Sequence, residues 1–97
     1  MKNHYTIKTA ADLCGLHEQS LRTYERRGLI APQRSQGNIR QFSHADIEQI
    51  RFIKRLTDEL GVNLAGVEVI IHLREQLLKV QNELDAIKIH SAHSDSL

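Results

Sequence analysis

The chain has 97 residues and a formal net charge of +1, and 40% of its residues are hydrophobic but only 4% aromatic, which suits one small domain and leaves few side chains for an aromatic ligand pocket. Its one cysteine, Cys14, excludes an intramolecular disulfide framework and a cysteine-cluster metal site. The N-terminus has no apolar core of signal-peptide length, and no stretch reaches the ~20 apolar residues of a membrane span, so we expect a cytoplasmic protein with no membrane partner.

Two short helices joined by a tight turn are expected at the start of the chain, after a short extended stretch at residues 5–7. Thr9 and Asp12 have the spacing of a capping box, and Gly15 can end the first helix in a left-handed conformation. The second helix should run over residues 18–27 and end before Gly28. This arrangement predicts a helix-turn-helix.

The second helix concentrates the positive charge of the chain. Residues 19–40 contain five arginines and one acid, Glu25. Arginine can pair with guanine, and glutamine with adenine, through two hydrogen bonds in the major groove. The candidate base-contacting residues on this helix are Gln19, Arg22, Thr23 and Arg26. The alternative is a solvated helix face that binds nothing, since arginine is common on surface helices.

A small hairpin is expected next. Residues 32–38 are loop-forming, and residues 39–42 alternate apolar and polar as a half-buried strand does. Arg34 and Arg40 on this hairpin predict a wing that grips the DNA backbone and minor groove, which favours the DNA interpretation of the preceding helix. A carboxylate facing phosphate would be repelled, so we expect Glu25 to form an ion pair that orients Arg22, Arg26 or a wing arginine.

The remainder of the chain is expected to be helical. Ser43 and Asp46 have the form of a second capping box, which opens a helix with apolar residues from Ile47 to Leu60. Gly61 should stop that helix, and Asn63 can cap the last one.

The last helix carries a heptad seam, because its apolar residues recur in steps of three and four: Ile70, Leu73, Leu77, Val80, Leu84 and Ile87. The seam could pack internally, or its outer part could pair with a second chain. We expect residues up to Leu73 to pack within the chain, and four residues to mediate homodimerisation: Leu77, Val80, Leu84 and Ile87. The tail, residues 90–97, is expected to be disordered.

Several fragments together resemble the winged-helix DNA-binding domain of MerR-type transcription regulators. They lie between residue 5 and about residue 73: Tyr5-Thr6-Ile7, Leu21-Arg22-Thr23-Tyr24-Glu25, Gly28-Leu29-Ile30, Pro32, Arg34, Gly37, Arg40, Phe42 and Asp46-Ile47. Within that family, Leu16-His17 and residues 61–67 look most like the heat-shock repressor (HspR) branch.

The resemblance implies homodimers that bind inverted repeats in double-stranded DNA upstream of chaperone genes, with the chaperone DnaK as a co-repressor in some members. It also implies DNA contacts from Arg22, Tyr24 and Arg26 on the recognition helix and from Arg34 and Arg40 on the wing. The chain departs from the family pattern at His17, where a capping Ser or Thr is common, at Thr23, which replaces a Tyr, and at Asn38-Ile39 in the wing.

We therefore expect a mostly α fold: a winged helix-turn-helix with a β-hairpin wing over residues 1–73, a coiled-coil dimerisation helix over 74–89 and a tail over 90–97. The expected function is a sequence-specific repressor of heat-shock genes, without a cofactor. The six histidines are scattered, and no nucleophile–base set is evident, so neither a metal site nor an enzyme is expected. The alternative is a MerR-like chaperone modulator that binds a J-domain co-chaperone; retention of the arginines argues against it.

Overall fold

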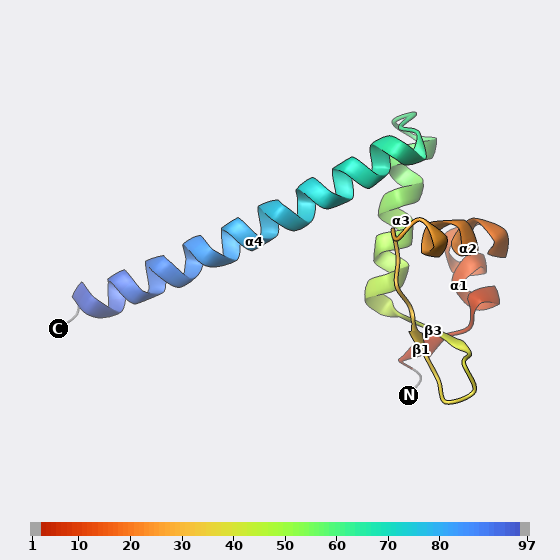
Figure 1. Cartoon of the computed structure of the whole chain (residues 1–97), viewed down its shortest axis with the longest axis horizontal. Coiled ribbons are helices and arrows are strands. Elements are labelled where there is room, and N and C mark those ends of the chain that lie inside the picture. The colour runs from red at the N-terminus through yellow and green to blue at the C-terminus, as the bar shows by residue number, and fades with distance from the viewer. Residues whose placement is uncertain (1–2, 96–97) are drawn as a thin grey trace. The chain divides into compact units, whose positions relative to one another are not determined.

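The computed structural model describes residues 3–95. The elements are, in order, β1 (His4–Tyr5), α1 (Ile7–Cys14), α2 (Glu18–Arg26), β2 (Gln33–Arg34), β3 (Arg40–Ser43), α3 (His44–Asp58) and α4 (Leu64–Asp95) (Figure 1). The chain divides into two compact units at Val67. The expectation of a mostly α fold with a small wing and a long C-terminal helix is confirmed.

The first helix begins earlier than the sequence suggested. Thr6 has an extended backbone (φ −71°, ψ 164°), and its hydroxyl accepts a hydrogen bond from the Thr9 N–H at 3.2 Å. Thr6 is thus the N-cap, and the predicted capping box of Thr9 and Asp12 is wrong. The reason is tertiary: the last residue of strand β1 that pairs with β3 is Tyr5, so the chain leaves the sheet at Thr6 and enters the helix immediately.

The turn between α1 and α2 follows the prediction. Gly15 adopts a left-handed conformation (φ 66°), and its N–H donates to carbonyls in the last turn of α1. Helix α2 starts after His17, whose side chain forms no capping hydrogen bond, which agrees with the weak capping expected of histidine. Gly28 (φ 75°) then turns the chain out of α2. Helix α1 packs against both α2 and α3, which fixes the orientation of α2.

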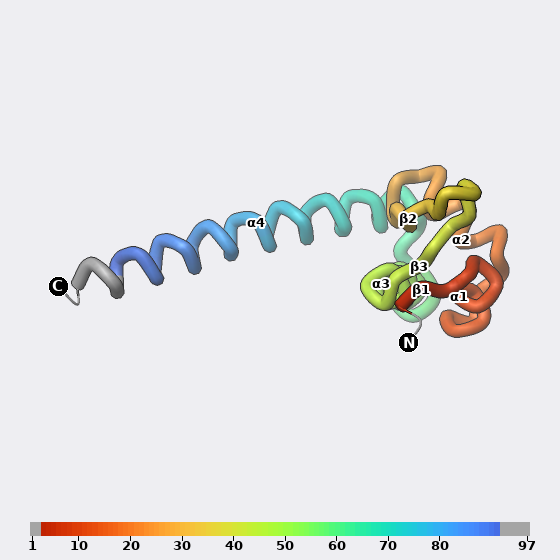
Figure 2. Tube along the Cα trace, turned by 90° about the horizontal axis from the view of Figure 1, so that it is seen from below, coloured from red at the N-terminus to blue at the C-terminus, as the bar shows by residue number. Residues whose placement is uncertain are grey.

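The wing is the outer part of a three-stranded antiparallel sheet in the order β1-β3-β2 (Figure 2). Arg34 pairs with Arg40, and Tyr5 with Phe42. The wing turn is closed by the Ser35 N–H donating to the Ile39 carbonyl at 2.9 Å, and Asn38 supplies a left-handed residue (φ 61°). The predicted hairpin is confirmed, one residue later on its second strand, and β1 extends it to three strands.

Helix α3 forms the centre of the core. Its capping box is confirmed: the Ser43 hydroxyl accepts from the Asp46 N–H at 3.1 Å, and the Asp46 carboxylate accepts from the Ser43 N–H at 2.8 Å. The largest fully buried side chains are Phe42, Leu21, Ile47, Ile50, Ile53 and Val67. Leu60, expected on the buried face of this helix, is 66% exposed, because α3 ends at Asp58 and the backbone turns before Gly61 (φ 66°).

Helix α4 begins after Asn63, whose side-chain oxygen accepts from the Gly66 N–H at 2.8 Å, as a capping residue does. It then continues to Asp95, because no glycine or proline follows Gly66 in this stretch to end it. The predicted disordered tail is therefore corrected for residues 90–95, and residues 96–97 lie outside the described part. The boundary expected after residue 73 lies inside a continuous helix.

Two further observations concern the last helix. Leu73 is 59% exposed, so the expectation that the seam packs within its own chain up to this residue is wrong there. Within the described residues, no helix combines the length and apolar character that crossing a membrane requires.

Candidate nucleic-acid interface

Helix α2 presents one polar face to solvent and one apolar face to the core. Gln19, Arg22 and Arg26 are exposed, and Thr23 is half-buried beside them. Leu21, at 1% exposure, lies on the opposite face. The structure thus brings the four predicted base-contacting residues of this helix to a single surface.

The arginines on this surface are held only loosely by their neighbours. Arg22 lies 3.5 Å from the Glu18 carboxylate, with about two-fifths of each side chain exposed, and Arg26 donates to the Thr23 hydroxyl at 3.2 Å. Exposed ion pairs between residues one helical turn apart contribute only about 0.3–0.5 kcal/mol to the stability of the fold. Both guanidinium groups can therefore exchange these contacts for a stronger anionic partner.

Tyr24 belongs to the scaffold. It is only 6% exposed, and burial, which disfavours the charged phenolate, raises the pKa of its hydroxyl, with a smaller contribution from Asp58. The sequence contained an indication of this burial, since Leu21 and Tyr24 share a helical face. The DNA contact that the family resemblance implies for Tyr24 remains a prediction.

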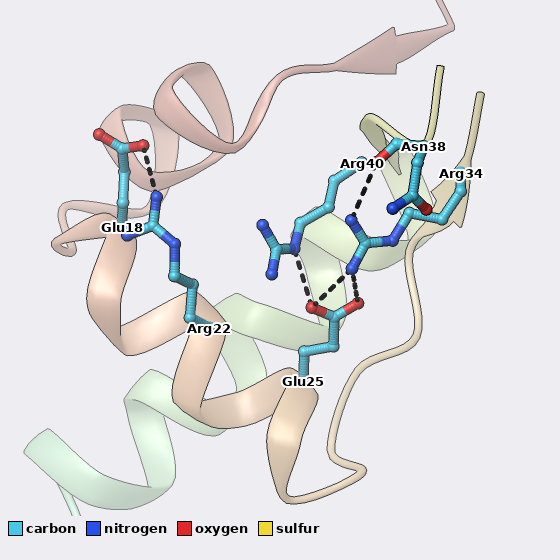
Figure 3. A network of polar contacts seen from close by, with 6 residues as sticks. All are labelled: Glu18, Arg22, Glu25, Arg34, Asn38 and Arg40. Carbon is cyan, nitrogen blue, oxygen red and sulfur yellow. Dashed lines mark hydrogen bonds and ion pairs between the residues drawn. The ribbon is translucent and has the colours of Figure 1, made fainter. Parts of the chain in front are cut away.

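Glu25 joins the recognition helix to the wing (Figure 3). Arg40 donates from Nε to one carboxylate oxygen of Glu25 at 2.8 Å. Arg34 donates from Nη2 to both oxygens, at 3.2 and 3.4 Å. The side chains of Glu25 and Arg40 are 23% and 24% exposed, so this ion pair is better shielded from water than that of Arg22. The expectation that Glu25 pairs with a wing arginine is confirmed.

The wing geometry explains why two arginines reach the same carboxylate. Arg34 and Arg40 are directly opposed on neighbouring strands, so their side chains leave the same part of the hairpin. Arg34 also donates from Nη1 to the Asn38 carbonyl at 3.2 Å, inside the wing turn. The contact therefore links the recognition helix, both wing strands and the turn. We call the set Glu25, Arg34, Arg40 and Asn38 the wing clasp.

The predicted dimerisation residues are exposed. Leu77, Val80, Leu84 and Ile87 are 68%, 58%, 43% and 62% exposed. Sequence reasoning did not single out three other exposed apolar residues of α4, Val69, Leu78 and Ile89, at 58%, 54% and 71%. All three lie off the seam, because consecutive helical residues are about 100° apart.

In the part of the chain that the structure describes, no three His, Cys, Asp or Glu side chains gather closely enough to hold a metal ion. Cys14 is buried and its thiol faces the Ile47 carbonyl at 3.9 Å. Burial raises the pKa of that thiol, partly offset by Arg51 and Lys54.

A helix-turn-helix with an exposed basic second helix, and a hairpin fastened to that helix, defines the class of winged helix-turn-helix domains. The family model described as "MerR HTH family regulatory protein" matches residues 5–80. The chain belongs to the MerR family.

Similar proteins agree with this assignment. The chain is 46% identical over 77 residues to the heat shock protein HspR of Streptomyces coelicolor, covering 79% of this chain and 51% of that protein. It is 33% identical over 85 residues to the regulator GlnR of Bacillus cereus (88% and 60%), and 43% identical over 79 residues to the regulator MlrA of Escherichia coli (80% and 31%). The chain thus spans about half the length of its HspR relative.

A solved structure shows the same fold. HiNmlR, described as a MerR family regulator lacking the sensor domain and bound to promoter DNA, superposes with a TM-score of 0.67 over 93% of this chain and 74% of that chain, at 22% identity.

Proposed function

We propose that this protein is a sequence-specific DNA-binding transcription regulator that inserts α2 into the major groove. The observation that carries the proposal is the single exposed surface formed by Gln19, Arg22, Thr23 and Arg26. Membership of the MerR family and the names of its relatives, which are regulators of transcription, support it.

The chemistry of this surface suits base contacts. An arginine that donates two hydrogen bonds to guanine O6 and N7, or a glutamine that pairs with adenine, discriminates against the wrong base by about 1–3 kcal/mol. Arg22 is the leading candidate for such a contact, because its 3.5 Å ion pair with Glu18 is largely exposed and easily exchanged. A wing arginine supplies a sequence-independent phosphate contact, which fixes the register of α2 along the groove.

We further propose that the protein acts as a homodimer on an inverted repeat and represses heat-shock or chaperone genes. The likeness to HspR supports the gene class, and the exposed seam of Leu77, Val80, Leu84 and Ile87 supports pairing through α4. A two-fold dimer places its recognition helices on half-sites about 34 Å apart or near multiples of that distance. DnaK is the co-repressor that the resemblance to heat-shock repressors implies.

The experiment is selection of bound fragments from the genome of the source organism, followed by affinity measurements on the recovered sequence. We expect an inverted repeat near chaperone genes. Arg22→Ala should lose about 1–3 kcal/mol of specific binding and relax the base preference at one position of each half-site. Arg55→Ala is the matched control, because Arg55 is exposed on α3, outside the recognition helix and the wing.

Two results would count against the proposal. If the Arg22→Ala variant and the wild type bind the selected repeat with equal affinity, the surface around Arg22 does not recognise the DNA bases. Failure to enrich any fragment, together with capture of a J-domain co-chaperone by the purified protein, would favour the chaperone-modulator alternative instead.

A further inference from the structure

We infer that Glu25 is a positioning residue that fixes the wing on the recognition helix, and that the two wing arginines have different roles: Arg34 is held inside the wing clasp, whereas Arg40 is the arginine that meets a DNA phosphate. The inference rests on the proposed DNA-binding function and deepens it. The sequence alone treats the two arginines as equivalent.

Both terminal nitrogens of Arg34 already donate hydrogen bonds within the wing clasp. A guanidinium binds an oxyanion best through two parallel N–H groups on its planar edge. In Arg34 one terminal nitrogen donates to the Asn38 carbonyl at 3.2 Å, and the other donates to both oxygens of Glu25, at 3.2 and 3.4 Å. Turning this edge toward DNA would break the contacts that hold the wing turn.

Arg40 is arranged in the opposite way. Its contact with Glu25 uses only Nε, at 2.8 Å, and its two terminal nitrogens lie beside Nε, on the side of the view where Arg22 is drawn (Figure 3). Among the described residues, no buried side-chain nitrogen or oxygen lacks a hydrogen-bond partner. The terminal nitrogens of Arg40, to which no acceptor is assigned, therefore reach solvent, with four N–H groups available.

Exposure alone would favour the reverse assignment, because the Arg34 side chain is 38% exposed and that of Arg40 24%. The direction of the hydrogen bonds decides the matter, since a phosphate requires N–H groups that are not already donated. The Arg40 guanidinium is also oriented by a short ion pair on its Nε, so less side-chain freedom is lost when its terminal edge binds.

The arrangement has an electrostatic consequence. One carboxylate shared by two guanidinium groups leaves the clasp with a single net positive charge. Because Arg40 alone contacts a phosphate, the wing of each copy should contribute about 0.9, rather than twice that, to the salt dependence of DNA binding.

Two double variants of equal net charge test the assignment. Glu25→Gln/Arg34→Gln and Glu25→Gln/Arg40→Gln each remove one positive and one negative charge from the clasp. Binding of both proteins and of the wild type is measured against salt concentration, on a mixed-sequence duplex and on the selected repeat.

We expect the Glu25→Gln/Arg34→Gln protein to keep the wild-type salt slope on the mixed-sequence duplex, because Arg40 remains, and to lose about tenfold in affinity for the selected repeat, because the wing is no longer fixed. The Glu25→Gln/Arg40→Gln protein should have a slope lower by about 1 for each bound copy. Equal slopes for the two variants, or the reverse order, would overturn the assignment while leaving the proposed function intact.

The clasp can also be measured without DNA. In a double-mutant cycle of Glu25→Gln and Arg34→Gln, followed by urea unfolding, the coupling should change the unfolding equilibrium constant about threefold. Additive single variants would refute the clasp. A wild-type protein that binds neither duplex would refute the proposed function and the phosphate role of Arg40 together, and the unfolding cycle separates that outcome from failure of the clasp itself.

Discussion

The proposed dimer interface can be tested by exchanging one leucine for alanine on each of two faces of α4. Leu77 lies in the heptad seam and is 68% exposed, and its neighbour Leu78 lies off the seam and is 54% exposed. If α4 pairs along the seam, Leu77→Ala should weaken the dimer strongly and Leu78→Ala should not. Alanine has the highest helix propensity, so neither change should shorten the helix.

The expected magnitude follows from the area that Leu77 still exposes. Complete burial of a leucine side chain contributes about 1.5–3 kcal/mol, so burying the exposed 68% would contribute about 1–2 kcal/mol in each copy. A two-fold dimer contains the substitution twice, which gives about 2–4 kcal/mol. Since 1.4 kcal/mol corresponds to a factor of ten, the dimer dissociation constant should rise by a factor of about 30 to 700.

Sedimentation equilibrium over a range of protein concentrations measures that constant, and circular dichroism verifies that the helical content is unchanged. The reasoning is refuted if the Leu78→Ala protein dissociates as readily as the Leu77→Ala protein, or if the wild type is monomeric at every concentration. In the first case α4 would pair through another face; in the second the exposed seam would need a different explanation.

Three experiments on the first unit test the fold. Ser43→Ala should lower the free energy of unfolding by about 1 kcal/mol in urea denaturation, because the hydroxyl that accepts from the Asp46 N–H at 3.1 Å is lost; no loss would mean that the cap is not formed in solution. Gly28→Ala should lower the free energy of unfolding by about 1 kcal/mol, because Gly28 has a left-handed backbone (φ 75°). Steric contact adds nothing to this cost, since nothing lies within 4 Å of the added methyl group. Gly37→Ala is the control: Gly37 has no left-handed φ, so the change should alter stability by less than about 0.5 kcal/mol. Cys14 should react with iodoacetamide near neutral pH far more slowly in the native protein than in urea, because burial raises the pKa of its thiol; equal rates would show that the thiol is accessible.

Local sequence patterns predicted most of the elements, and the exceptions have tertiary causes. The capping box of Ser43 and Asp46 and the left-handed turn at Gly15 involve residues within one helical turn, so the sequence specified them. Thr6 and Thr9 are both plausible N-caps. The choice between them depends on where β1 stops pairing with β3, a strand almost forty residues away.

For the candidate site, the sequence likewise predicted which residues share a helical face but not how the wing side chains are oriented. Helical spacing is sufficient to place Arg22 and Arg26 on one exposed surface. It also indicates that Tyr24 shares a face with Leu21, although the family resemblance assigned this tyrosine to DNA. The different orientations of Arg34 and Arg40 could not be predicted, because the torsions of a long side chain depend on neighbours that only the folded wing supplies.

The wing clasp and the α4 seam should together determine how strongly DNA binding depends on salt. The chain carries a net charge of only +1, and within the clasp one of two wing charges is neutralised by Glu25, so a single copy has few phosphate contacts to offer. Because the salt dependence of binding scales with the number of phosphates neutralised, two copies on one duplex should show about twice the slope of one. A Leu77→Ala protein that binds as a monomer should therefore lose half of the slope as well as affinity. If affinity falls but the slope is unchanged, the two copies must still assemble on the DNA, and the seam would govern association in solution rather than the form that occupies the repeat.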